Sequence, residues 1–189
     1  LSYACDNMGF SSIGVVRDGS AKEDSSTLSF CKQNNMKLYY LDRSTYRRNK
    51  YSNYLLNYLK NIFGKFYVLP EGGNNLFGVK GCEEIIQEIN VNYDYLCVPV
   101  GTGCTASGLI RGMENRKKFI GFAPFQKTIE QNNSIRSFCD TKLYNNWQLI
   151  ADNHFGGFGE IDGNLIKFVR EFKSNYNLEL DLIYMGKLF

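Results

Sequence analysis

The stretch from Pro99 to Gly112, PVGTGCTASGLIRG, places glycine and threonine where a strand-like run gives way to a helical pattern. Gly101 and Gly103 permit positive φ values, which aim successive backbone N–H groups to one side. Thr102 and Thr105 add hydroxyl groups beside an expected helix N-terminus, where an anion is stabilised. These features are typical of a phosphate-binding turn. The alternative is a tight turn in which the same residues serve only geometry and helix capping.

Nucleotide-binding motifs fit this turn less well. Gly101, Gly103 and Ala106 satisfy the G-x-G-x-x-A spacing of dinucleotide-binding folds, but such folds also need a carboxylate about 20 residues later. Residues 121–125, GFAPF, carry no carboxylate, and no lysine stands at the P-loop position. A nicotinamide cofactor is therefore disfavoured. A plain phosphate- or nucleotide-binding α/β module stays an alternative.

His154 is the only histidine of the chain. A site with several histidine ligands is therefore excluded, and we expect no metal. No G-x-S-x-G elbow accompanies His154, which lies in the sequence NHFGGFG. We expect it to form hydrogen bonds within a loop, although a Ser-His-Asp arrangement stays formally open.

Composition argues against a nucleic-acid partner and against a membrane partner. The 22 basic and 19 acidic residues are mixed along the chain, which argues against a nucleic-acid partner. The six cysteines form no C-x-x-C pair, as is usual for reduced thiols in the cytoplasm. No apolar run approaches the ~18 residues of a membrane helix, so we expect a cytoplasmic protein with no membrane partner.

Helical and strand-like patterns alternate along the chain. The patterns predict helices ending at Gly9 and over residues 25–36, 54–63, 79–89, 106–113, 132–146 (loosely) and 164–172, and strands over 11–16, 37–41, 65–69, 95–100 and 118–125. Residues 42–51 read as a polar connection, and 153–161 as a glycine-rich loop. This alternation predicts an α/β fold of three layers, in which helices cover both faces of mostly parallel sheets.

Two turns are expected at one edge of such a sheet. Ligands of parallel sheets bind at the carboxyl ends of the strands, where PEGGNN (70–75) and GTGCT (101–105) both lie. They could therefore face one common site. Glu71 is equally well placed as a turn residue or as a wall of that site.

The motifs PEGGNN, VPVGTGCTASGLIRG and LDLIYMGK, in this order and at these separations, resemble pyridoxal-phosphate enzymes of the tryptophan synthase β type, or fold type II. The nearer likeness is to the 1-aminocyclopropane-1-carboxylate deaminase and D-cysteine desulfhydrase family, and it extends to SIGVVRD and MKLYYLDRSTYR. The resemblance implies two lobes, with residues 1–62 in the smaller and 63–189 in the larger, cofactor-binding one. It also implies a homodimer that acts on a small amino acid.

The resemblance assigns site residues. Gly101, Thr102, Gly103, Cys104 and Thr105 would bind the phosphate of pyridoxal 5'-phosphate, although relatives often have glycine where Cys104 stands. Glu71, Gly72, Gly73 and Asn74 would wall the site, and Tyr184 would be a catalytic residue close to the substrate.

Two departures bear on the substrate. Met185 stands where the deaminases have glutamate and the desulfhydrases a small hydroxyl residue, and Phe158 is the counterpart of a deaminase tyrosine. Both count against opening of a cyclopropane ring. The leading activity is therefore that of a D-cysteine desulfhydrase, giving pyruvate, ammonia and sulfide. The alternatives are a 1-aminocyclopropane-1-carboxylate deaminase and a lysine-free, non-catalytic phosphate-binding protein.

The resemblance also requires groups outside this sequence. The lysine that binds the cofactor and a Ser-Asn loop should precede Leu1, and the hydroxyl partner of the pyridine nitrogen should follow Phe189. Neither Lys80 nor Lys187, which belongs to the MGK motif, stands in the context of that lysine. We therefore expect an interior fragment, incomplete at both ends and inactive by itself.

Overall fold

The structure, a computed structural model, describes residues 1–17, 24–140, 142–152 and 154–189. It divides into two compact units, Leu1–Tyr67 and Val68–Phe189, and each is described by itself. The boundary expected between residues 62 and 63 falls near the end of the first unit. None of the helices in the described ranges combines the length and apolar character needed to cross a membrane.

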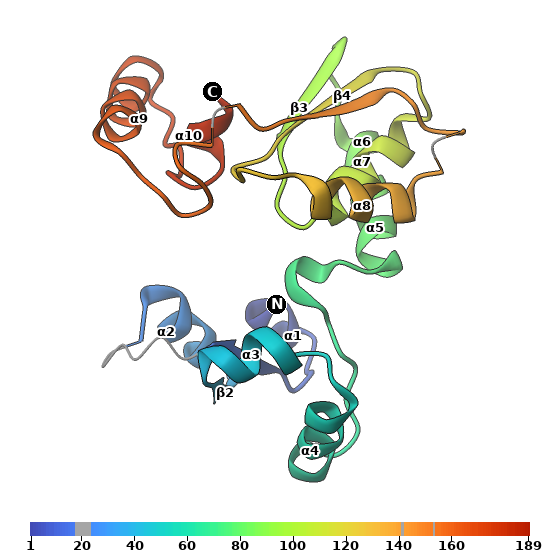
Figure 1. The fold of residues 1–189 in the computed structure, drawn as a ribbon, viewed down its shortest axis with the longest axis vertical. Coiled ribbons are helices and arrows are strands. Elements are labelled where there is room, and N and C mark those ends of the chain that lie inside the picture. The colour runs from blue at the N-terminus through green and yellow to red at the C-terminus, as the bar shows by residue number, and fades with distance from the viewer. Residues whose placement is uncertain (18–23, 141, 153) are drawn as a thin grey trace. The chain divides into compact units, whose positions relative to one another are not determined.

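The first unit, which is coloured from blue to teal in Figure 1, is built on two parallel strands. Strands β1 (Ile13–Arg17) and β2 (Lys37–Leu41) pair from Ile13 opposite Lys37 to Arg17 opposite Leu41. The helices of this unit are α1 (Ser2–Asn7), α2 (Ser26–Gln33), α3 (Arg43–Asn49) and α4 (Asn53–Phe63). A small core joins Leu41 of β2 to Leu55 and Leu59 of α4.

Two sequence predictions in this part of the chain are wrong. The polar connection over residues 42–51 contains helix α3, because the Asp42 carboxylate accepts from the backbone N–H groups of Ser44 and Thr45 and caps its first turn. Residues 65–69 form no strand. Their apolar side chains are largely exposed, with Tyr67 at 66%, and no described strand pairs with them.

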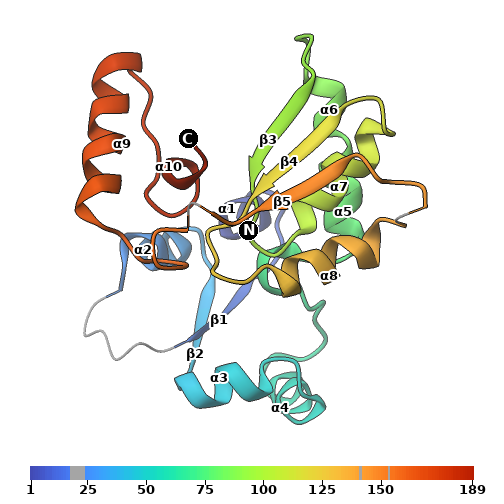
Figure 2. The same ribbon diagram turned by 45° about the horizontal axis from the view of Figure 1, so that its top comes forward.

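The second unit contains a parallel sheet of three strands in the order β3-β4-β5. In Figure 2 these strands stand between α10 and the group α5 to α8. Strand β5 was missed from the sequence. The strands are β3 (Tyr95–Pro99), β4 (Lys118–Phe122) and β5 (Trp147–Ile150), and the helices are α5 (Leu76–Glu83), α6 (Ile85–Glu88), α7 (Cys104–Met113), α8 (Ile129–Phe138), α9 (Gly163–Tyr176) and α10 (Met185–Leu188), with a short 3-10 turn at Glu71–Gly73.

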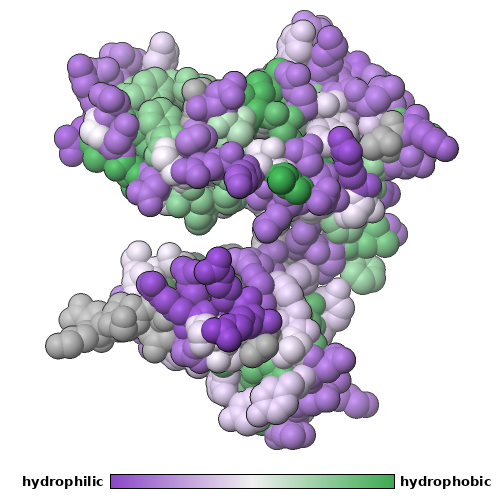
Figure 3. Space-filling view, viewed as in Figure 1, coloured by the Kyte–Doolittle hydropathy of each residue, from purple (hydrophilic) through white to green (hydrophobic). Residues whose placement is uncertain are grey.

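Helix α7 is the central helix of this unit. Its residues Ala106, Leu109, Ile110 and Met113 are buried with Phe119 of β4 in the main core. On the other side of the strands, α9 and α10 pack through Phe172 and Phe189, whose ring centroids lie 5.1 Å apart. Figure 3 shows hydrophobic residues gathered over α9 and α10.

Helices α5 and α7 approach closely because glycines lie between them. A β-carbon on Gly108 would lie 2.5 Å from the carbonyl oxygen of Val79 and would also collide with Cys82. Gly108→Ala should therefore destabilise the protein by about 3 kcal/mol, since it overpacks a contact made by backbone.

Gly81→Ala on α5 is the matched control, because nothing lies within 4 Å of the added carbon. It should be neutral or stabilising by up to about 1 kcal/mol through helix propensity. Urea unfolding measures both changes. Equal stability of the Gly108 variant and the wild type would contradict this packing.

Candidate active site

The turn after β3 has the geometry of an anion site. Gly103 has φ 97° and directly precedes α7, which begins at Cys104. Within the described residues, the backbone N–H groups of residues 101–105 donate to no protein acceptor. The positive end of a helix of ten residues therefore carries several N–H donors that are available to a ligand.

The lack of a capping side chain at α7 bears on the alternative of a purely structural turn. Ser52, Asn75 and Asp162 each accept a backbone hydrogen bond from the first turn of their helices, α4, α5 and α9. Gly103 offers no side chain to α7, and neither threonine of the turn makes a capping bond to it. An anion would supply the missing acceptor, which favours the phosphate interpretation.

Cys104 fits this turn without opening it. Its side chain is only 4% exposed, and its thiol donates to the carbonyl oxygen of Gly73 at 3.3 Å. Burial raises the pKa of this thiol, so the sulfur carries no negative charge beside a bound anion. Cys104 is bulkier than the glycine that relatives often have at this position, but its side chain is accommodated against the start of α5.

The segment 70–75 lies directly behind the turn. Gly72 has φ 67°, and a β-carbon there would stand 2.6 Å from the side chain of Thr102. Asn74 donates from its amide to the Ser134 hydroxyl of α8 at 3.0 Å. Ser134 in turn lies 3.1 Å from where a β-carbon on Gly103 would stand. The structure therefore brings the two glycine-rich turns together, with Ser134 supporting both.

Tyr184 points at the same turn. Its hydroxyl lies 3.1 Å from the position of a β-carbon on Gly101, so only glycine leaves the phenol its full space there. Burial raises the pKa of Tyr184, and the negative charges of Asp181 and Glu71 raise it further. The phenol is therefore a neutral hydrogen-bond donor at neutral pH. Glu71 thus acts electrostatically on the site besides forming the turn.

An aromatic wall extends from Tyr184. The ring of Phe158 packs edge-on against Tyr184 with centroids 5.7 Å apart, and it stacks on Phe125 at 5.3 Å. Met185, the next residue, is half-buried at the start of α10. The side of the site that Phe158 lines is apolar. Phe125, which stands in the GFAPF segment, was not predicted as part of it.

Asp181 fixes the backbone that carries Tyr184. Its carboxylate accepts from the N–H groups of Ile183, Tyr184 and Met185 at 2.8, 2.7 and 2.9 Å. Burial opposes ionisation of Asp181, but these backbone bonds outweigh it and lower the pKa of the carboxyl group. The turn before α10 is therefore held by an ionised side chain.

Asp181→Ala should destabilise this turn by about 1–2 kcal/mol at pH 7, as loss of a helix cap does. Because the folded pKa is depressed, the contribution is present above the unfolded value near 3.9 and is lost as the pH falls through the folded value. Unfolding of the wild type and the variant from pH 7 downward measures it. A stability difference that persists unchanged in acid would contradict this role of Asp181.

His154 lies in the loop 154–159 and forms a hydrogen bond within it, as the sequence predicted. Its Nδ1 accepts from the backbone N–H of Gly156 at 3.0 Å. No described serine or acidic side chain is bonded to the imidazole. The ring therefore shapes the loop, and the formally open triad has no geometry to support it.

Sequence comparison finds relatives of one kind. No protein-family model matches the chain. A protein of Pyrococcus horikoshii, provisionally named 1-aminocyclopropane-1-carboxylate deaminase, is 27% identical over 161 residues, which is 78% of this chain and 49% of the relative. A protein of Pyrococcus furiosus with the same provisional name is 26% identical over 167 residues, 79% of this chain and 51% of the relative. The chain spans about half the length of each.

Comparison with solved structures gives matches of the same kind as the sequence comparison. The crystal structure of an ACC deaminase homologue superposes with a TM-score of 0.75 at 26% identity, covering 98% of this chain and 61% of that one. A pyridoxal 5'-phosphate-dependent aspartate racemase has a TM-score of 0.60 at 11% identity, covering 100% and 63%. The chain has the fold of fold type II pyridoxal-phosphate enzymes. A hydrogen sulfide-producing enzyme from Fusobacterium nucleatum, with a TM-score of 0.59 at 15% identity and covering 99% and 66%, shares this fold.

The predicted resemblance and fold class are thereby confirmed. Within the fold type II architecture, the second unit holds every residue that the sequence assigned to the site. Sequence reasoning missed four residues that support them: three have partners far along the chain, and Asp181 was assigned no role although it stands in the LDLIYMGK motif. These residues are Phe125, Ser134, Asp181 and, in its structural role, Lys187.

Proposed function

We propose that the native protein is a pyridoxal-phosphate-dependent lyase acting on a small amino acid, with residues 101–105 binding the cofactor phosphate. The single observation that carries this proposal is the set of unbonded N–H groups at the uncapped start of α7. A phosphate dianion is the part of the cofactor that such donors bind best. The absence of β-carbons on Gly101 and Gly103 leaves room for the hydroxyl groups of Tyr184 and Ser134, each 3.1 Å from where such a carbon would stand.

The catalytic role proposed for this chain belongs to Tyr184. The cofactor supplies an electron sink for the carbanion formed at the substrate Cα. Tyr184 keeps its proton at neutral pH, because burial and the nearby carboxylates raise its pKa. Its Oη is therefore suited to give a proton to a leaving group and not to remove one. Its place beside Gly101 puts this donor next to the phosphate-binding turn.

We propose D-cysteine, or a related β-substituted amino acid, as the substrate. Loss of the Cα proton, cleavage of the C–S bond and hydrolysis of the C–N bond convert D-cysteine and one water into pyruvate, ammonia and hydrogen sulfide. Phe158 and Phe125 give an apolar wall on which a thiol group can pack. Met185 offers no carboxylate at the position where the deaminases have glutamate.

A 1-aminocyclopropane-1-carboxylate deaminase is the second candidate, because it is the activity for which both relatives are provisionally named. A homodimer, which the resemblance implies, and a cytoplasmic location, which the cysteine pattern favours, belong to the same proposal.

Product assays on the native protein, purified with pyridoxal phosphate, separate these functions. We expect sulfide and pyruvate from D-cysteine and negligible α-ketobutyrate from 1-aminocyclopropane-1-carboxylate. Robust α-ketobutyrate release would establish the second candidate and refute the argument from Met185. Cofactor binding without turnover of any small amino acid would establish a non-catalytic binding protein.

A further inference from the structure

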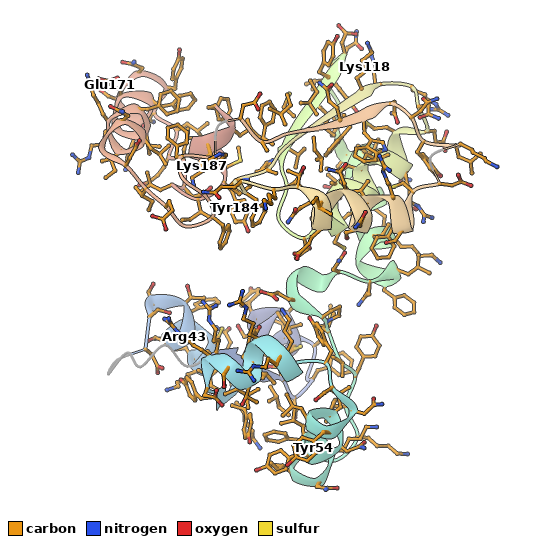
Figure 4. All side chains as sticks on the ribbon, viewed as in Figure 1. Arg43, Tyr54, Lys118, Glu171, Tyr184 and Lys187 are labelled. Carbon is orange, nitrogen blue, oxygen red and sulfur yellow. The ribbon has the colours of Figure 1, made fainter. Side chains whose placement is uncertain are left out.

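We infer that Lys187 is a positioning residue, whose buried ammonium group holds the loop 154–159 against the turn of Tyr184 and so places Phe158 in the wall of the site. This inference deepens the proposed function and rests on it. Figure 4 labels Lys187 and Tyr184 on the same short segment of the second unit. The MGK motif thus carries a lysine with a role other than cofactor attachment.

The environment of the Lys187 ammonium group is unusual. The residue is only 3% exposed. Its Nζ donates to the carbonyl oxygens of His154 at 3.0 Å and of Gly157 at 2.8 Å. A buried ammonium group is costly unless its donors are satisfied. Here two backbone carbonyls accept from it. Burial lowers the pKa of Lys187, and the negative charges of Glu160 and Asp162 partly oppose that shift.

The loop has an irregular backbone that is strained at Phe155, while its glycines adopt positive φ values freely. Phe155, Gly156, Gly157 and Gly159 all have positive φ values, of 50, 90, 132 and 81°. A bulky residue at positive φ costs about 1–3 kcal/mol and persists only where its surroundings hold it. The ammonium group donates to two carbonyl oxygens of this loop at once, so it fixes the path of the chain between them.

The connection to the site runs through neighbouring residues. Phe158 follows Gly157, whose carbonyl Lys187 holds, and its ring contacts both Phe125 and Tyr184. The backbone N–H of Lys187 donates to the Tyr184 carbonyl at 3.2 Å. One residue therefore ties the wall residue and the catalytic phenol together. Without the ammonium group, Phe158 would lose its fixed place, whereas the turn 101–105 would keep its own contacts.

The test is Lys187→Met in the native protein, with Lys167→Met as the matched control. Methionine keeps much of the length of the side chain and removes the donors. Lys167 lies on α9 and is 76% exposed, so its replacement should leave the kinetics unchanged. For Lys187→Met we expect KM for D-cysteine to rise about tenfold with kcat less affected and cofactor content unchanged, as for loss of a positioned binding surface.

Two further measurements separate positioning from a general loss of stability. The effects of Lys187→Met and Phe158→Ala on KM should be non-additive, because the lysine acts through the ring. If Lys187→Met does not fold, Lys187→Gln, which retains a donor, takes its place. Additive effects, or unchanged KM together with a lowered Tm, would overturn the inference.

Hydrogen exchange tests whether Lys187 holds the loop 154–159, without any assay of activity. The amides of residues 155–159 should exchange at least about tenfold faster in Lys187→Met than in Lys167→Met. Unchanged exchange would overturn the inference even if the enzyme is active. Faster exchange in a protein that turns over no amino acid would instead place the failure in the proposed function.

Discussion

Gly103→Ala should lower the affinity of the native protein for pyridoxal phosphate by about 10- to 100-fold. Gly103 has φ 97°, a conformation in which an L-residue costs about 1–3 kcal/mol. The added carbon would also lie 3.1 Å from the Ser134 hydroxyl, which is held by Asn74. Relief of either conflict would move the N–H groups that we propose bind the phosphate. Titration of cofactor-free protein with pyridoxal phosphate measures the change.

The control for this prediction is Gly163→Ala. Gly163 is the first residue of α9, and nothing lies within 4 Å of an added β-carbon. Its replacement should leave cofactor affinity unchanged. If both variants bind pyridoxal phosphate as the wild type does, the turn after β3 does not hold the phosphate.

Tyr184→Phe should reduce kcat for D-cysteine by about 100-fold or more, the usual contribution of a positioned acid. The change keeps the ring that packs against Phe158 and removes only the Oη proton. Cofactor content should therefore stay the same. Steady-state kinetics and absorbance of the bound cofactor measure the two quantities.

Tyr176→Phe removes a phenol from an exposed position on α9 and serves as the control. It should have the kcat of the wild type. Undiminished kcat in Tyr184→Phe would show that the proton of Tyr184 takes no part in the rate-limiting chemistry.

Local chemistry made much of the second unit predictable. Gly101 and Gly103 both permit a positive φ, and the structure has one at Gly103 but not at Gly101. Strands β3 and β4 have enough apolar and aromatic residues to stand out from the sequence. The parallel sheet follows from their alternation with helices.

The errors arose where partners far along the chain decide the structure. Residues 65–69 have strand-forming side chains but no described strand beside them, and their exposure reflects this. Strand β5 was missed because Trp147–Ile150 is short and gains its place only by pairing with β4. Helix α3 was missed for a local reason, since the capping signal at Asp42 was present and was outweighed by the polar composition.

In the site too, residues within motifs were predictable from the sequence, whereas contacts between residues far apart in the sequence were not. The glycines and Tyr184 lie in motifs that resemble known families, whereas Ser134 meets Asn74 across 60 residues of sequence. Lys187 meets the carbonyls of His154 and Gly157 across 33 and 30 residues. A lysine in a short C-terminal motif gives no sign in the sequence that its charge will be buried by a distant loop.

The most direct test of the phosphate-binding turn is a crystal structure of the native protein with pyridoxal phosphate. The account predicts phosphate oxygens at about 3 Å from the backbone nitrogens of residues 101–105, the usual hydrogen-bond distance. It also predicts the Tyr184 hydroxyl beside the bound cofactor. A phosphate bound elsewhere, with the N–H groups of this turn facing solvent, would contradict the account.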